Sequence, residues 1–497
     1  MKRKKLAEAL NEIRDTYIEE AAFYKKRRLP QWVYPAAALL AIAVLVSALW
    51  TPAKTSLTSP TESPTTSIRY EGISHAPIDH NIQSQFLVAT PQYPVLCGYP
   101  LEGSDNNYSN WRKDQLAIHT QPEGYADSLL PFWEKFMAQL SSDTQGENLV
   151  CSPVNVYMAL AMLAEITDGQ SRQQILDTLG VDSIETLRMQ VKDVWLGHYN
   201  DDGLSTSVLA NSLWLEENYG FNQETADFLA ENYYASVFQG DLGSDEMNSV
   251  LQAWLDQQTG GLLKEQVYET ELDPMTVLAL ASTIYYKVQW IDEFKEQKNT
   301  DAVFHGTKGD STATYMNQTL SYGPYYWSDH FGAVSLSLED GSTMWLILPD
   351  EGINPESIAD EVQQFLANDP DSFNSNYKKQ KNVQVNLSVP KFDVSSGLNL
   401  KDTLEHMGIT HVFSGTEADF SPILSDDDGG FVSDVQHAAR VSIDEKGVTA
   451  AAFTIIDRCG AGMPSEEVID FVLTRPFLFC VESQDGLPLF AGIVNEP

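Results

Sequence analysis

The segment 444–456 joins a charged start to a strand-like run, and this combination limits what the chain can fold into. It begins DEKG and continues VTAAAFTII. As a helix it lacks an N-capping pattern and an apolar stripe with a 3.6-residue period. As a strand it places small or apolar residues, from Val448 to Ile456, on one face that fits between two other strands. Residues 459–464, CGAGMP, are too rich in Gly and Pro for a strand. The segment therefore predicts an exposed loop that contains an unused strand.

The chain is acidic, and its charge is unevenly distributed. Its 497 residues carry a formal net charge of -39, whereas residues 1–34 hold nine Lys or Arg and five Asp or Glu. The acidic body argues against nucleic acid as a partner, and the basic head suggests that the two parts meet different environments. The four cysteines form no C-x-x-C pair, which excludes a zinc ribbon and a disulfide scaffold; they are Cys97, Cys151, Cys459 and Cys480.

An uncharged run of 19 residues, Trp32 to Trp50, follows the basic cluster KKRR at 25–28. As a helix it spans about 28 Å, which is enough to cross a bilayer. Trp32, Tyr34 and Trp50 bracket it as an aromatic belt. We expect a single-pass anchor, with residues 1–31 cytoplasmic and the rest outside the cell membrane. The alternative is a cleaved secretory signal, against which stand the long basic head and the poor cleavage site SAL at 47–49.

The remainder divides into a linker and a globular domain. Residues 51–67 are rich in Ser, Thr and Pro and predict a stalk, and the whole of 51–116 is assigned to this stalk and an extension of unassigned role. Within that extension, residues 86–97 predict an additional strand or strap. We expect the globular domain to occupy residues 117–497.

The pattern of the globular part predicts helices first and then mainly strands. Residues 125–140 have apolar residues at helical spacing, and residues 154–163 are almost wholly apolar, which predicts a central helix. This order predicts a large α+β fold. The expected strands are 205–215, 276–289, 333–338, 343–348, 383–389, 477–481 and 489–494.

Nine short stretches, in order, resemble segments of the serpins, a family of suicide inhibitors of proteases. They are NLVCSPVNVYMALAML (148–163), LANSLWL (209–215), WLDQQTGGLL (254–263), STIYYKVQW (282–290), MWLILPDEG (344–352), VNLSVPKFDV (385–394), LEHMGITHVF (404–413), HAARVSIDEKG (437–447) and RPFLFCV…LPLFAGIV (475–494). The resemblance implies large mixed and antiparallel sheets, eight or nine helices and an exposed reactive loop, here preceded by a transmembrane helix. With this anchor, we expect a membrane-anchored serpin of the bacterial type.

The resemblance assigns a hinge to the opening segment. In serpins, cleavage of the reactive loop lets the small residues after the hinge insert as a strand into the main sheet. We expect glycine at 447 because the hinge must pass through torsions that glycine adopts freely. Valine at 448 replaces the usual Thr or Ser, but it is uncharged and favours strands. The hinge residues are Glu445, Lys446, Gly447, Val448, Thr449, Ala450, Ala451 and Ala452.

The reactive bond follows from counting along the loop. Taking the hinge glutamate as the first residue, the seventeenth is Ala461, so the expected bond joins Ala461 and Gly462. Counting back from Arg475 gives a later position, and the alternatives Arg458 and Met463 stay open. Ala461 suits an elastase-like or subtilisin-like protease, Arg458 a trypsin-like one and Met463 a protease with broader preference.

A polar cluster controls opening of the main sheet in serpins, and Ser152 and His437 match two of its members. The asparagine expected beside them is replaced by Ser282, whose shorter side chain we expect to need a bridging water. The alternative for His437 is a core histidine with satisfied hydrogen bonds.

The resemblance thus implies an irreversible inhibitor of a serine, or alternatively a cysteine, protease. We expect a monomer without cofactor or metal. The alternative is a non-inhibitory serpin that binds or carries a ligand. No G-x-S-x-G, H-E-x-x-H, P-loop or G-x-G-x-x-G occurs, which argues against an enzyme. The tract DDDGG at 426–430 lacks the ligand spacing of a calcium loop.

Overall fold

The computed structural model describes residues 85–100, 105–122, 125, 129–143, 146–260, 271–272, 276–367, 377–425, 430–433, 435–448 and 467–497. The chain divides into two units at residue 68, and all of these ranges belong to the second. The anchor expected at Trp32–Trp50 and the stalk lie outside the described residues. Within them, no helix combines the length and apolarity needed to span a bilayer.

Nine α-helices lie in these ranges, and α6 is central among them. Ser152 caps α6 by accepting a hydrogen bond from the Asn155 backbone N, Pro153 occupies its first turn, and nearly all of its residues are buried. The helices are α4 (Asp105–His119), α5 (Leu129–Asp143), α6 (Pro153–Glu165), α7 (Gly169–Leu179), α8 (Ile184–His198), α9 (Gln223–Asn232), α10 (Asp245–Gln258), α12 (Ala359–Ala367) and α13 (Lys401–His406). Three short 3-10 turns add η2 (Glu296–Lys298), η3 (Pro355–Ile358) and η4 (His411–Phe413).

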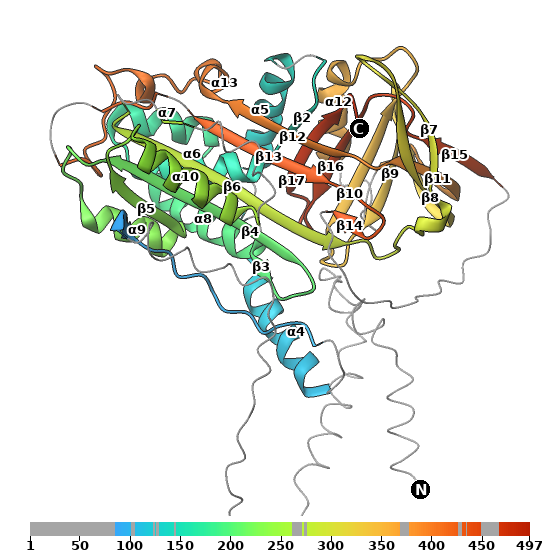
Figure 1. Cartoon of the computed structure of the whole chain (residues 1–497), viewed down its shortest axis with the longest axis horizontal. Helices are drawn as coiled ribbons and strands as arrows, with labels where there is room; N and C mark the ends of the chain where they lie inside the picture. The colour runs from blue at the N-terminus through green and yellow to red at the C-terminus, as the bar shows by residue number, and fades with distance from the viewer. Residues whose placement is uncertain are drawn as a thin grey trace, which may run out of the picture. The chain divides into compact units, whose positions relative to one another are not determined.

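An eight-stranded sheet, called here the main sheet, has the order β1-β5-β4-β6-β13-β12, with β3 beside β4 and β14 beside β6 (Figure 1). Its strands are β1 (Leu87–Ala89), β3 (Asn200–Asp201), β4 (Thr206–Glu216), β5 (Ala235–Gly240), β6 (Leu278–Gln289), β12 (Asp393–Asn399), β13 (Gln436–Ser442) and β14 (Gly447–Val448).

A nine-stranded sheet has the order β15-β11-β8-β9-β10-β16-β17-β2, with β7 beside β8. Its strands are β2 (Leu149–Cys151), β7 (Thr300–Gly306), β8 (Gly309–Trp327), β9 (Phe331–Ser337), β10 (Thr343–Pro349), β11 (Gln380–Pro390), β15 (Val468–Val472), β16 (Phe477–Glu482) and β17 (Pro488–Val494).

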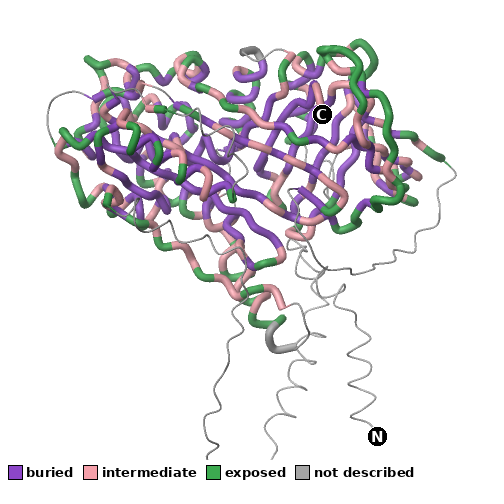
Figure 2. The backbone as a smooth tube through the Cα atoms, in the orientation of Figure 1, coloured by how far each residue is buried: buried purple, intermediate pink, exposed green. Residues whose placement is uncertain are grey.

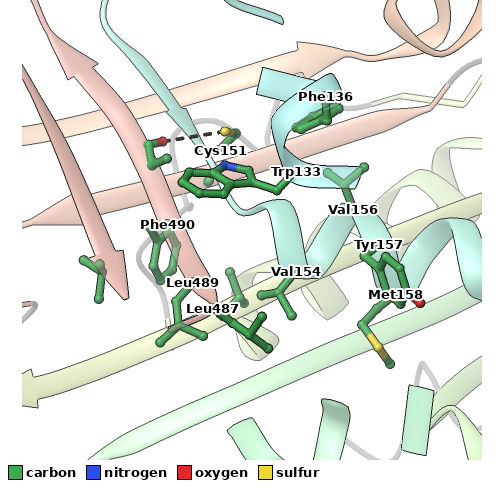
Figure 3. Close-up of a cluster of buried hydrophobic side chains, with 14 of the residues drawn as sticks. Trp133, Phe136, Cys151, Val154, Val156, Tyr157, Met158, Leu487, Leu489 and Phe490 are labelled. Carbon is green, nitrogen blue, oxygen red and sulfur yellow. Dashed lines mark hydrogen bonds between the residues drawn. The ribbon is translucent and has the colours of Figure 1, made fainter. Parts of the chain in front are cut away.

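The largest core lies around α6, which contacts both β6 of the main sheet and β17 of the second sheet. Figure 2 shows the buried chain concentrated along these strands and helices. In Figure 3, Trp133, Phe136 and Phe490 surround Cys151, whose thiol donates to the Ala491 carbonyl at 3.6 Å. Burial raises the pKa of Cys151 to about 12, so this thiol is unreactive at neutral pH.

A smaller apolar cluster lies under α10, on the other face of the main sheet. Trp254 and Leu251 of α10 pack there with Trp214 of β4 and Phe238 of β5. The Trp214 and Phe238 rings stack with centroids 4.2 Å apart. The main sheet is therefore covered on both faces, by α6 on one side and by α10 on the other.

The main sheet is weakly paired between β6 and β13. Strand β6 pairs with β4 over ten residues but with β13 over only two, Ala281 with Gln436 and Ser282 with His437. We call this β6/β13 junction the seam. Because each ladder bond adds to the cohesion of a sheet, the seam is the most weakly paired junction among β5, β4, β6, β13 and β12.

The observed elements agree with the expected α+β fold, with small shifts. Each of the seven expected strands overlaps one of the observed strands. The helix expected from residue 125 is described as α5 from Leu129, with Pro131 in its first turn, where a helix tolerates proline. The expected extra strand within 86–97 is present as β1, and α4 spans the domain boundary expected at 116/117.

Candidate functional site

The described hinge residues, 445–448, lie against the main sheet, beside β6 and the end of β13. Strand β14 pairs antiparallel with β6, with Gly447 opposite Gln289 and Val448 opposite Val288. Val448 is only 1% exposed and packs into the large core. It also bridges to Ile443 at the end of β13. The first two residues of a new strand are therefore already paired with β6.

Gly447 is required here by close packing. A Cβ atom on it would lie 2.1 Å from the Val288 carbonyl oxygen and 2.7 Å from the Gln289 Cα. Gly447 is not among the glycines with a positive φ. In this structure the position needs glycine because two backbones approach closely, and the torsional freedom expected for movement of the hinge stays a prediction.

Glu445 fixes the hinge to neighbouring elements. Its carboxylate pairs with Lys391 Nζ at 2.6 Å and accepts a hydrogen bond from Asn299 Nδ2. Its backbone carbonyl accepts from the Phe294 N at 2.9 Å. Burial alone would raise the pKa of Glu445, but the hydrogen bonds from Lys391 and Asn299 outweigh it and lower the pKa below its usual value.

A tight turn brings β14 back beside β13. Asp444 Oδ1 accepts hydrogen bonds from the backbone N of Lys446 and of Gly447, at 2.8 and 3.2 Å. Trp290 follows β6 and binds the turn twice, with its backbone N on the Lys446 carbonyl and its Nε1 on the Asp444 carbonyl. The turn is therefore held by Asp444 and Trp290, which lie outside the hinge.

The structure brings Ser152, Ser282 and His437 together at the seam. The Ser152 backbone N donates to His437 Nε2 at 3.1 Å. Ser282 and His437 are paired residues of β6 and β13. The partner of Ser282 is Asn155: its Oδ1 accepts from Ser282 Oγ at 2.6 Å. Ser282 thus has a direct partner in α6, and the expectation that a water joins it to Ser152 and His437 stays a prediction. The role of these residues in sheet opening stays a prediction.

An apolar cavity lies directly beside this cluster. It is lined by Leu160 and Leu163 of α6, Leu280 of β6, Val435 and His437. The cavity lies along the seam, at residues adjoining the two β6/β13 pairs. The seam thus has a small, mainly apolar cavity beside it, next to the strands that an inserting strand would have to separate.

Several expected site residues lie outside the described residues. These are hinge residues 449–452, the reactive bond at Ala461 and Gly462, and the alternatives Arg458 and Met463. Conversely, the sequence did not identify Asn155, Lys391 or Asn299. Asn155 has the spacing Ser-x-x-Asn after a helix cap, but the other two are far from the hinge in sequence. In the described ranges, no group of three or more His, Cys, Asp or Glu residues is placed to hold a metal ion.

Burial makes His437 sensitive to acid. Burial lowers the pKa of His437 from 6.5 to about 4, and Nε2 of the ring already accepts a hydrogen bond from the Ser152 backbone N. Between pH 6.5 and 4, His437 is protonated in the unfolded chain but stays neutral in the native state. The free energy of unfolding is therefore expected to fall by about 2–3 kcal/mol as pH decreases through this interval, and this contribution is fully present above pH 6.5.

Chemical denaturation at several pH values, compared with His437→Gln, isolates this contribution from the other titrating groups. The difference between the two proteins should change between pH 6.5 and 4 and stay constant above 6.5. A difference independent of pH would contradict the assignment.

Comparisons with known proteins agree on one family. Residues 131–497 match the family model described as "Serpin (serine protease inhibitor)". Serpin-ZX of Arabidopsis thaliana is 28% identical over 376 residues, which cover 72% of this chain and 94% of that protein. Serpin-Z1A of Triticum aestivum is 28% identical over 363 residues, 70% of this chain and 90% of that protein. These relatives are plant proteins, and they give no support to the expected bacterial type.

Solved structures give the same fold. The native state of tengpin, a thermophilic serpin, has a TM-score of 0.67 at 25% identity and covers 76% of this chain and 95% of tengpin. A complex of thyroxine-binding globulin with thyroxine has a TM-score of 0.65 at 21% identity, covering 75% of this chain and 99% of that one. The second likeness concerns the fold alone.

Proposed function

This chain belongs to the serpin family of serine protease inhibitors, and we propose that it traps a target protease by inserting its reactive loop into the seam between β6 and β13. Members of this family are described as serine protease inhibitors and not as catalytic enzymes. The protease would attack the loop and form an acyl-enzyme, and cleavage would free the loop to insert before deacylation.

The pairing of β14 with β6 is the observation that carries this proposal. Val448 lies opposite Val288, and the two strands run antiparallel. Continued in this register, residue 454 would lie opposite Ser282 and residue 456 opposite Leu280, which lines the apolar cavity. The side chains on that face are Val448, Ala450, Ala452, Thr454 and Ile456. They are small or apolar, as a strand entering a finished sheet requires.

We place the reactive bond at Ala461–Gly462, with cleavage after Arg458 or Met463 as the alternatives. The test mixes the protein, as full chain or as the unit 69–497, with pancreatic elastase, subtilisin and trypsin. A complex that survives denaturing electrophoresis is expected, together with a released peptide that begins at Gly462. A peptide beginning at Cys459 or Pro464 would assign Arg458 or Met463 instead.

Each protease is also tested with its catalytic serine chemically blocked, which should abolish the complex. Cleavage without any stable complex would contradict inhibition. That outcome would favour the alternative of a non-inhibitory serpin that binds or carries a ligand.

We further propose that Trp32–Trp50 anchors the inhibitor in the cell membrane as a monomer with the serpin domain outside. The uncharged length of this run and its basic flank support the anchor. Deleting residues 32–50 is expected to move the protein from the membrane pellet to the supernatant without loss of inhibition. Retention in the pellet would contradict the anchor.

A further inference from the structure

Residues 85–100 bind along one edge of the main sheet, and they precede the part of the chain that matches the family. Strand β1 pairs antiparallel with β5, with Leu87 opposite Phe238 and Ala89 opposite Val237. The Phe86 carbonyl accepts from the Gln239 N at 2.8 Å. We call residues 85–100 the strap. Because β5 would otherwise end the sheet, the strap adds a strand to its open edge.

An aromatic socket on the body receives Tyr93 of the strap. The Tyr93 ring lies 5.6 Å from Trp195, 6.0 Å from Tyr199 and 6.0 Å from Tyr234, and in each pair the rings are within 12° of parallel. Trp195 is itself held by a hydrogen bond from Nε1 to the Leu209 carbonyl at 2.9 Å. The socket is therefore built from fixed side chains of the body.

Backbone conformation supports the same interpretation. Tyr234 has a φ of 51°, and it is the one non-glycine residue with a positive φ in the described ranges. Its ring stacks on Trp195 with centroids 3.6 Å apart. A tyrosine in the left-handed region costs free energy, and such positions gather at ligand-binding sites. Here the strained residue forms one wall of the socket.

Body residues also bind the backbone of the strap. Gln223 Nε2 donates to the Val88 carbonyl at 3.1 Å, and Tyr199 Oη donates to the Pro94 carbonyl at 3.1 Å. Main-chain contacts of this kind recognise any extended peptide, and a side-chain socket adds selectivity. The edge of β5 and the aromatic socket together have the character of a peptide-binding groove.

The chain beyond the strap connects the two sides of the seam. On the β4 side, Trp111 Nε1 of α4 donates to Asp202 Oδ2 at 2.7 Å. On the other side, Tyr125 Oη donates to Asp485 Oδ2 at 3.0 Å, in the turn between β16 and β17. Strand β17 pairs with β2, and β2 contacts β12 and β13. Through β17 and β2 the connection reaches the β13 side of the seam, and the Tyr286 and Phe490 rings, 5.9 Å apart, join β17 to β6 as well.

We propose that the edge of β5 and the socket of Trp195, Tyr199 and Tyr234 form a binding site for an extended peptide with an aromatic side chain, that the chain's own strap fills it, and that filling it keeps the seam closed. The binding site itself does not depend on inhibition. The effect of the strap on the seam rests on the proposed function in one respect: the reactive loop is proposed to insert at the same seam.

The binding test uses the full chain carrying Tyr93→Ala and a fluorescent peptide of residues 85–100 with Cys97→Ser. The variant loses its own ring from the socket, so it should bind the peptide at least tenfold more tightly than the unchanged protein, whose strap competes at high effective concentration. The same peptide with Tyr93→Ala should not bind. Equal binding by variant and unchanged protein, or none by either, would overturn the site.

The seam is tested by hydrogen exchange of peptides from β6 and β13, which requires no protease. Exchange in the Tyr93→Ala variant should be at least tenfold faster and should slow again when the peptide is added. Val95→Ala is the matched control, because Val95 lies in the strap but is 97% exposed. Peptide binding with unchanged exchange would overturn the effect on the seam. Failure to trap any protease would contradict the proposed function. The peptide-binding and hydrogen-exchange measurements would still test the strap, because neither uses a protease.

Discussion

Replacing Val448 with glutamate is expected to abolish stable complexes with the target protease while the reactive loop is still cleaved. Val448 is 1% exposed and lies opposite Val288 at the start of the proposed insertion. An isolated carboxylate at such a site costs several kcal/mol, or the backbone must leave β6 to hydrate it. Insertion would then be too slow to precede deacylation, and the protein would act as a substrate.

The measurement for this prediction is the number of inhibitor molecules consumed for each protease molecule inactivated. It should rise at least tenfold for Val448→Glu. Val448→Thr, which has nearly the same volume and no charge, is the matched control and should stay close to the unchanged protein. Unimpaired inhibition by Val448→Glu would show that insertion does not pass through the β14 pairing.

Reversing the charge at Glu445 is expected to destabilise the hinge strongly. Glu445→Lys removes the ion pair with Lys391 and the hydrogen bond from Asn299, and it places two cations together. The Glu445 side chain is 15% exposed and the Lys391 side chain 37% exposed, so water moderates the loss, and removing the ion pair together with the hydrogen bond costs about 1–3 kcal/mol. The free energy of unfolding in urea should fall by about that amount, since Lys391 is left without its counter-charge.

The exchanged pair Glu445→Lys with Lys391→Glu separates the charge effect from packing. It restores opposite charges at the same two positions, so at least half of the lost stability should return. Lys391→Glu alone should be destabilising because it sets two carboxylates side by side. A double variant no more stable than Glu445→Lys would show that the ion pair does not hold the hinge.

The fold was predictable where a strand is buried and its local sequence shows a clear run of apolar residues. The expected strand 343–348 agrees with β10 because its apolar run is buried between two partners. Strands β7 and β8 were not expected. Their sequence from 300 to 327 is rich in Thr, Ser and Gly, and much of it is exposed. Their pairing with each other and with β11 determines their structure, and no local pattern carries this information.

The candidate site was predictable only where the resemblance named its residues. Glu445 and Gly447 were identified from the hinge motif, but the close approach of β6 to Gly447 was not foreseen. Lys391 lies within a stretch that resembles the family, yet its partnership with Glu445 joins residues more than fifty positions apart. A single sequence does not show which lysine forms an ion pair with which glutamate far along the chain, because many of both are available.

The two residue pairs of β14 also have a kinetic consequence. Starting a strand in a sheet requires closing a loop and fixing several torsions before many contacts form, and this first step dominates the entropic barrier. Here Gly447 and Val448 have completed that step before any protease arrives. Growth of the strand then adds one residue at a time against β6. In the proposed mechanism, the competition between insertion and acyl-enzyme hydrolysis would therefore be decided by how fast the two β6/β13 pairs separate.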